Sequence, residues 1–197
     1  MLFLARTQAS LFFVNRLRHE KLEQRSRKFV LYNGVPFLLF FLVFLIWTLF
    51  DEGYAVDPVT KVVSLEEMKY LHNFTDMPWI LVLFILGVAA VLYGTFKTVF
   101  SPRFRKGIWF TGAGTIIVVT MLLLIAGYNN TAYYPSSIDL QSSLTLENSS
   151  SSEFTLTAMA VVSLFVPVVI GYIIYAWGAL EKKKLGMEEL DTDGNAY

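Results

Sequence analysis

Four apolar runs, each about as long as a bilayer is thick, constrain this chain more than any other feature. They occupy residues 29–50, 78–96, 107–128 and 155–180. A helix needs about 20 apolar residues to cross the hydrocarbon core, where every backbone polar group must be bonded internally. The 197-residue chain is 55% hydrophobic, and its mean hydropathy is +0.52, which is too apolar for a soluble domain. We therefore predict an all-α integral membrane protein with four full transmembrane helices in a bundle.

A fifth apolar stretch, residues 1–14, is too short to cross the bilayer and contains Arg6. No small-residue cleavage site follows it, and its charge comes after the apolar part, so a secretory signal is not indicated. We expect a truncated N-terminal helix, and we expect the chain to be the C-terminal part of a longer polypeptide. Arg6 is either buried and paired or extends to the polar surface, and the basic segment that follows favours the second alternative.

The charges predict how the chain is oriented and divided. Lys and Arg lie almost entirely at 15–28, at 97–106 and after the fourth run, whereas the opposite loops hold only Lys61 and Lys69 among several acidic residues. The positive-inside rule places the basic loops and the C-terminus in the cytoplasm. The expected divisions are a truncated helix end with a basic cytoplasmic loop, a four-helix transmembrane bundle and a cytoplasmic tail, at residues 1–28, 29–180 and 181–197. The net charge is zero, so no global field would attract nucleic acid.

Two serines are expected to cap helices. Ser64-Leu65-Glu66-Glu67 has the form of a capping box and predicts a short surface helix that begins at Ser64. The segment from Ser150 to Glu153 repeats the pattern before the fourth run, with Ser150 as the expected cap. The acidic segment 188–194 is interpreted as a solvated tail, because its Asp-x-Asp-Gly fragment lacks the rest of a calcium loop.

The apolar runs carry no set of residues suited to catalysis. Their central parts contain no ionisable side chain, which argues against a pump. His19 and His72 lie outside the runs, whereas a haem between helices usually needs axial His or Met ligands from those helices. Met121 and Met159 are interpreted as packing residues. With no cysteine, thiolate ligands are excluded, and we predict no catalytic, cofactor-binding or metal-binding residue in this chain.

Small residues and prolines inside the runs predict how the helices pack. Gly112-Ala113-Gly114 and the pair Ala90 and Gly94 favour close approach of neighbouring helices. Pro36 and Pro167 are expected to kink their helices.

A dispersed set of residues in the last third of the chain carries a resemblance to a known family. The set comprises Pro135, Ser136, Ser137, Ser143, Leu144, Thr145, Ser151, Ser152, Thr155, Leu156, Met159 and Pro167. This region resembles the C-terminal part of subunit II of the cytochrome bd quinol oxidases. Upstream, Lys106-Gly107-Ile108-Trp109 is similar to the start of a family span, and Arg6-Thr7 to the end of a mid-chain helix.

The likeness is greatest to the Bacteroidetes branch of the family, where the segments 133–137 and 53–56 also fit. One segment departs from the pattern. Asn129-Asn130-Thr131 stands where many members have an apolar run with Phe-Pro.

The resemblance implies a bacterial inner-membrane complex that oxidises quinol and reduces dioxygen to water in an electrogenic reaction. It implies that haem b, haem d and the quinol site lie on a larger subunit I, while subunit II has two four-helix bundles and ligates no haem. The implied partners are the haem-bearing subunit I, the lipid bilayer and, through the complex, the quinone pool. Family members are nearly twice as long, and the polar residues proposed to line a proton path fall in the half that has no counterpart here.

Two other classes of protein remain as alternatives. An independent four-span membrane scaffold or small permease fits the apolar runs. The absence of ionisable residues from the centres of the runs weighs against a permease, and the motif residues weigh against a scaffold. A membrane hydrolase or transferase would need a nucleophile and base pair, and none is recognisable in the sequence.

Overall fold

The computed structural model describes residues 1–17 and 19–181, and most of them are helical. The elements are α1 (Leu2–Arg16), α2 (Glu20–Phe50), β1 (Gly53–Val56), β2 (Val63–Glu66), α3 (Lys69–Asp76), α4 (Pro78–Phe100), α5 (Gly107–Gly127), η1 (Leu140–Ser142), α6 (Leu146–Ser149), α7 (Glu153–Ser163) and α8 (Val166–Glu181). Within these described residues, four helical segments are long and apolar enough to span a bilayer, namely α2, α4, α5 and the segment Glu153–Ala179 formed by α7 and α8. The all-α membrane class is therefore confirmed. The predicted acidic tail lies outside the described residues.

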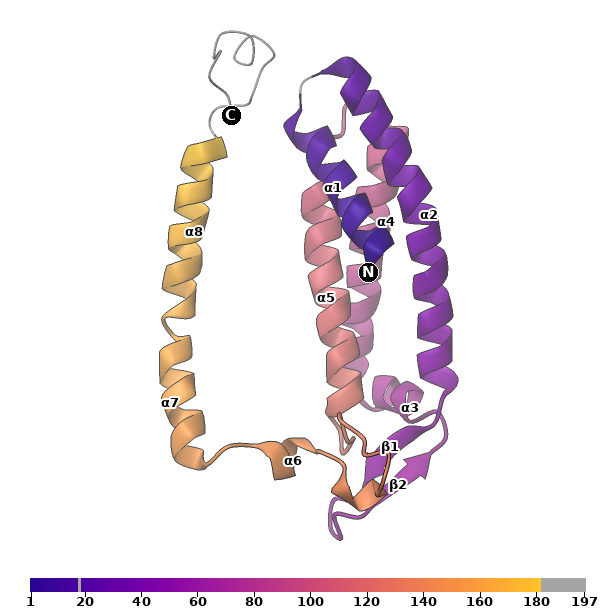
Figure 1. Cartoon of the computed structure of the whole chain (residues 1–197), viewed down its shortest axis with the longest axis vertical. Helices are drawn as coiled ribbons and strands as arrows, with labels where there is room; N and C mark the ends of the chain where they lie inside the picture. The colour runs from indigo at the N-terminus through magenta and orange to yellow at the C-terminus, as the bar shows by residue number, and fades with distance from the viewer. Residues whose placement is uncertain (18, 182–197) are drawn as a thin grey trace.

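The helices that pack together differ from those expected. In Figure 1, α1, α2, α4 and α5 lie side by side, while α7 and α8 stand apart. The short helix α1 takes the fourth place because it buries one face, at Thr7, Ser10, Leu11 and Val14. Of the described residues 153–179, none is buried. The sequence places this fourth span inside the bundle, whereas in the structure it lies apart from α1, α2, α4 and α5.

Glycines allow α4 and α5 to approach closely. Gly87 and Gly94 on α4, and Gly107 and Gly114 on α5, are each seven residues apart and so share a face. In this antiparallel pair, a Cβ added at Gly114 would lie 2.6 Å from the Gly87 carbonyl, and one at Gly94 would lie 2.7 Å from the Gly107 carbonyl. Close packing was correctly predicted at Gly94 and Gly114. Gly112 instead faces open space.

The main apolar core lies where α3 meets one end of α4 and α5. It contains Phe74, Met77, Ile80, Phe84, Val118, Met121 and Ile125, all buried. The rings of Phe74 and Phe84 are 5.2 Å apart and tilted. Met121 is a packing residue, as the sequence predicted, whereas Met159 is exposed and the prediction is wrong for it within the described chain.

A β-hairpin replaces the first predicted cap. β1 and β2 are antiparallel, and Ser64 pairs with Ala55 inside the sheet. The prediction that Ser64 begins a helix is therefore wrong. The alternating segment of β2 pairs with β1, and ladder bonds between the two strands replace the local cap. The helix α3 begins five residues later, after Met68 in the left-handed conformation (φ 53°).

The second predicted cap is displaced by two residues. Ser152, not Ser150, caps α7, with its hydroxyl accepting a bond from the Thr155 amide at 3.4 Å. The prediction for Ser150 is wrong because residues 146–149 form α6, and Ser150 ends that helix by donating its hydroxyl to the Leu146 carbonyl.

The two prolines behave differently. Pro36 lies within the continuous helix α2. Pro167 is the second residue of α8, directly after the interruption at Leu164 and Phe165 that separates α7 from α8. Since proline lacks an amide proton, it removes one bond from the helical ladder and is tolerated best in the first turn, where Pro167 lies.

Candidate functional site

Polar side chains gather at the two ends of the helix bundle. We call residues 16–28 and 97–106 the basic end, because they contain ten basic and two acidic residues. We call residues 51–77 and 128–152 the hairpin end, since they include β1 and β2. The two ends face opposite sides of the bundle (Figure 1).

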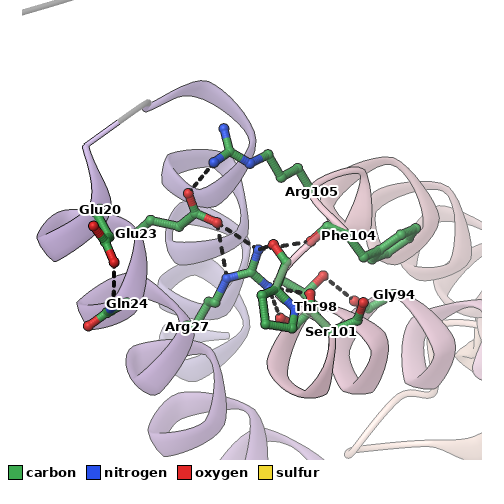
Figure 2. A network of polar contacts seen from close by, with 10 residues as sticks. Glu20, Glu23, Gln24, Arg27, Gly94, Thr98, Ser101, Phe104 and Arg105 are labelled. Atoms are coloured by element: carbon green, nitrogen blue, oxygen red, sulfur yellow. Dashed lines mark hydrogen bonds and ion pairs between the residues drawn. The ribbon is translucent and has the colours of Figure 1, made fainter.

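At the basic end, Arg27 of α2 closes the end of α4. Its Nη1 donates to the carbonyls of Thr98 and Ser101, and its Nη2 donates to those of Pro102 and Phe104 at 2.8 and 3.1 Å. The last carbonyls of a helix have no partner within the helix, and a cation there also suits the helix dipole. Arg27 therefore stabilises the end of α4 and fixes the loop to α5, as Figure 2 shows.

One buried carboxylate holds this arginine and a second one. Glu23 Oε1 accepts from Arg27 Nη2 at 2.8 Å and from its Nε at 3.2 Å, while Oε2 pairs with Arg105 (Figure 2). Glu23 is only 9% exposed. From the sequence alone, Arg27 and Arg105 are recognisable only as members of basic loops. The Glu23–Arg27 spacing of four residues was the available signal, but nothing local indicated Arg105.

At the hairpin end, Asn73 closes the end of α5 in a similar way. Its side chain is fully buried, and Nδ2 donates to the Ile125 carbonyl at 2.7 Å and to Thr131 Oγ1 at 2.9 Å. Its Oδ1 accepts from Asn129 Nδ2 at 3.1 Å. Asn129 and Asn130 both adopt left-handed backbone conformations (φ 57° and 54°). The departure from the family pattern at 129–131 thus forms a polar turn that packs on α3.

The loop after this turn is fastened to the hairpin. Gln141 of η1 accepts from the Val63 amide at 2.9 Å and donates to the Val63 carbonyl at 2.8 Å, so its amide group extends the sheet. Tyr134 and Leu144 form an isolated antiparallel bridge. Ser143 is fully buried, and its hydroxyl accepts from the Ser136 amide at 3.0 Å.

The residues that carried the family resemblance are therefore only partly brought together. Ser136, Ser143, Leu144 and Thr145 order the loop, and Thr145 caps α6 in a capping box with Asn148. The others lie in exposed positions of the loop or of α7 and α8, namely Pro135, Ser137, Ser151, Ser152, Thr155, Leu156, Met159 and Pro167.

An ionic contact joins the hairpin to α3. Glu66 Oε1 lies 2.8 Å from His72 Nδ1, and Glu66 Oε2 lies 3.3 Å from Lys69 Nζ. The hydrogen bond from His72, followed by the contact with Lys69, lowers the pKa of Glu66 below its ordinary value of 4.5. In the tip of the hairpin, backbone bonds from Thr60 and Val59 lower the pKa of Asp57.

The polar contacts at both ends of the bundle join helices, strands and loops to one another. Among the residues that the structure describes, no three His, Asp or Glu side chains come together as a metal site. The two histidines lie at opposite ends of the bundle, His19 just before α2 and His72 in α3. What the geometry provides is closure of both ends of the bundle by side chains from other helices.

Comparison with known proteins identifies the family. Residues 1–180 match the family described as cytochrome bd terminal oxidase subunit II. The chain is 28% identical to a probable cytochrome oxidase subunit 2 of Haemophilus influenzae, over 82% of this chain and 44% of that protein. It is also 28% identical to the cytochrome bd-I ubiquinol oxidase subunit 2 of Escherichia coli, over 64% of this chain and 33% of that protein. The chain thus spans less than half the length of these curated relatives. With nearly all of its described residues inside the match, the chain belongs to the cytochrome bd terminal oxidase subunit II family.

Proposed function

We propose that this chain serves as subunit II, or its C-terminal part, in a cytochrome bd-type quinol:oxygen oxidoreductase. In this proposal it supports a larger subunit I in the bacterial inner membrane, and haem b and haem d are bound by that partner. Oxidation of quinol from the quinone pool and reduction of dioxygen belong to the complex. The observation that carries the proposal is the family match over residues 1–180, which includes all four spans and both ends of the bundle.

The structure supports a role in assembly. The ends of α4 and α5 are fixed by Arg27 and Asn73, side chains from other elements, so the bundle has closed ends. The helices α7 and α8, by contrast, expose large apolar side chains such as Leu156, Phe165 and Trp177. Exposed apolar surface of this extent on a spanning helix is available to lipid or to a neighbouring subunit.

We also propose an orientation in the membrane. The basic end lies in the cytoplasm, and so does the C-terminus, while the hairpin end faces the opposite side. The support is the contrast in charge between the two ends, because Lys and Arg in short loops are retained on the cytoplasmic side.

The proposal is tested by purifying the natural full-length protein with an affinity tag from its own membranes. We expect a larger membrane subunit to co-elute, with haem bands in the visible absorption spectrum. An unrelated four-span membrane protein with the same tag serves as the control. A haem-free preparation without a larger subunit, obtained from membranes that do contain the haem-bearing protein, would overturn the proposal.

A second measurement separates this role from an independent scaffold or permease. Membranes from cells that lack the gene should lose quinol-dependent oxygen consumption, and the reintroduced gene should restore it. Retained oxygen consumption in those membranes, with no other quinol oxidase present, would count against the proposed role.

A further inference from the structure

A lysine at the basic end is held in place by aromatic rings. Lys97 lies one turn before the end of α4, with Nζ 4.6 Å from the centre of the Tyr93 ring and 5.1 Å from that of Phe104. Its ammonium group also bonds to the Tyr93 hydroxyl. Tyr93, Phe104 and Phe110 contact one another, with ring centres 5.1 to 6.0 Å apart. Because a cation over aromatic faces is favourable, this long side chain is confined to one region of the surface.

The same contact brings two arginines to this region. Arg103 and Arg105 flank Phe104 in the chain, and consecutive Cα atoms are about 3.8 Å apart. The salt bridge with Glu23 anchors Arg105, which remains 39% exposed, and Arg103 is exposed. Residues 97–106 contain four basic residues and no acidic one. Lys97, near the end of α4, thus contacts the ring of Phe104, and the two arginines flank that residue in the loop to α5.

Exposed aromatic surface adjoins this group of cations. Phe96 and Phe100 lie on the last turns of α4, stacked with ring centres 6.3 Å apart, and they are 43% and 75% exposed. Phe100 follows Phe96 by four positions and Lys97 by three, so it neighbours both of them on the helix surface. Since α4 is a spanning helix, these rings lie at the level where the hydrocarbon meets the headgroups.

We propose that Lys97, Arg103 and Arg105 form a binding site for the phosphate headgroup of an anionic phospholipid, whose acyl chains lie against Phe96 and Phe100. Cations beside exposed rings complement a ligand that is negative at one end and apolar at the other, and contacts restrain two of the three cations, Lys97 and Arg105. A soluble anion would use only the cations, which is why the site is assigned to a lipid. The inference concerns the chain itself and does not depend on the proposed respiratory role.

The site is tested with the purified full chain in phosphatidylcholine bilayers that contain spin-labelled phosphatidylglycerol. The preference of the immobilised lipid fraction for phosphatidylglycerol over phosphatidylcholine is measured by electron paramagnetic resonance. We expect Lys97→Gln and Arg103→Gln each to lower this preference roughly fivefold, because that is the attraction for an anionic lipid that one basic residue typically contributes. Lys97→Arg should keep the preference near that of the unchanged chain.

The matched control is Lys21→Gln, which removes one positive charge from an exposed position at the same end. We expect it to leave the preference largely unchanged. If Lys21→Gln lowers the preference for phosphatidylglycerol as much as Lys97→Gln does, the attraction to the basic end is diffuse and the site is overturned. An unchanged preference in Lys97→Gln would also overturn the site. Displacement of the labelled lipid by millimolar inorganic phosphate would reassign the site to a soluble anion. Elution of each variant at the position of the unchanged chain in gel filtration excludes misfolding as the cause.

Discussion

Arg27 is the single residue whose loss should most weaken the basic end. Replacing it by Gln removes the guanidinium bonds to four carbonyls at the end of α4 and in the loop to α5, and leaves Glu23 with only Arg105. Breaking a largely buried ion pair costs about 3 kcal/mol. We therefore expect Arg27→Gln to lower the thermal midpoint of the purified chain in mild detergent by several degrees, measured by circular dichroism.

The control for this variant is Lys28→Gln, the exposed neighbour, which should change the midpoint little. The double variant Glu23→Gln with Arg27→Gln should cost less than the sum of the single changes, because both remove the same contact. Strict additivity would show that Glu23 and Arg27 do not act as one unit.

The contact between Glu66 and His72 should give the hairpin end a dependence on acid pH. The pKa of Glu66 is lowered in the folded protein, chiefly by the hydrogen bond from His72. Its carboxylate therefore stabilises the fold above the unfolded value of 4.5, and this stabilisation is lost as the pH falls through the lower folded pKa. Glu66 is partly exposed, so the effect should stay below about 1 kcal/mol.

This dependence is measured as the difference in thermal midpoint between the unchanged chain and Glu66→Gln from pH 6 to pH 3. The difference should shrink as the pH falls below 4.5. A difference that stays constant over this range would contradict the role assigned to the carboxylate.

At the scale of helices, the contact between α4 and α5 depends on two opposed glycine pairs. A Cβ at Gly114 would lie 2.6 Å from the Gly87 carbonyl and 2.9 Å from the Val91 amide nitrogen. Backbone atoms cannot move aside as a side chain can, so the helices must separate. We expect Gly114→Ala to destabilise the chain by about 1 to 3 kcal/mol, the usual cost of overpacking, measured by thermal unfolding in detergent.

Gly112, two residues away on the same helix, provides the matched control. An added Cβ there meets nothing within 4 Å, so Gly112→Ala should be neutral or slightly stabilising. If both substitutions destabilise the chain equally, the loss of stability comes from a change within α5 and not from its contact with α4.

The elements show how far the sequence could predict this fold. The spans were predictable because lipid imposes a long apolar run, and the starts of α4 and α5 agree with the runs at residues 78 and 107. The hairpin was missed because Ser64-Leu65-Glu66-Glu67 satisfies a local capping rule, whereas its strand pairing depends on a separate segment, Gly53–Val56. The closures by Arg27 and Asn73 join segments more than 50 residues apart, and no local pattern specifies such partners.

For the whole molecule, the separation of α7 and α8 from the bundle predicts the effect of a deletion. Since no described residue of 153–179 is buried, removal of residues 153–197 should leave the bundle's thermal midpoint within a few degrees. Removal of residues 129–197 should lower it much further, because Thr131 and Gln141 are lost as partners of Asn73 and Val63. Equal loss in both truncations, measured by circular dichroism, would show that the last helix supports the bundle.

The orientation of the whole chain can be tested by single cysteines, because the sequence contains none. Ser137→Cys is exposed at the hairpin end and Gln24→Cys at the basic end, and both positions are uncharged. If the basic end is cytoplasmic, a membrane-impermeant maleimide should label Ser137→Cys in intact spheroplasts and Gln24→Cys only after permeabilisation. Val59 is 86% exposed. Val59→Cys should be labelled under the same conditions as Ser137→Cys, because Gln141 joins the hairpin to the loop that contains Ser137. The reverse pattern would invert the orientation, and it would place the proposed lipid site in the opposite leaflet.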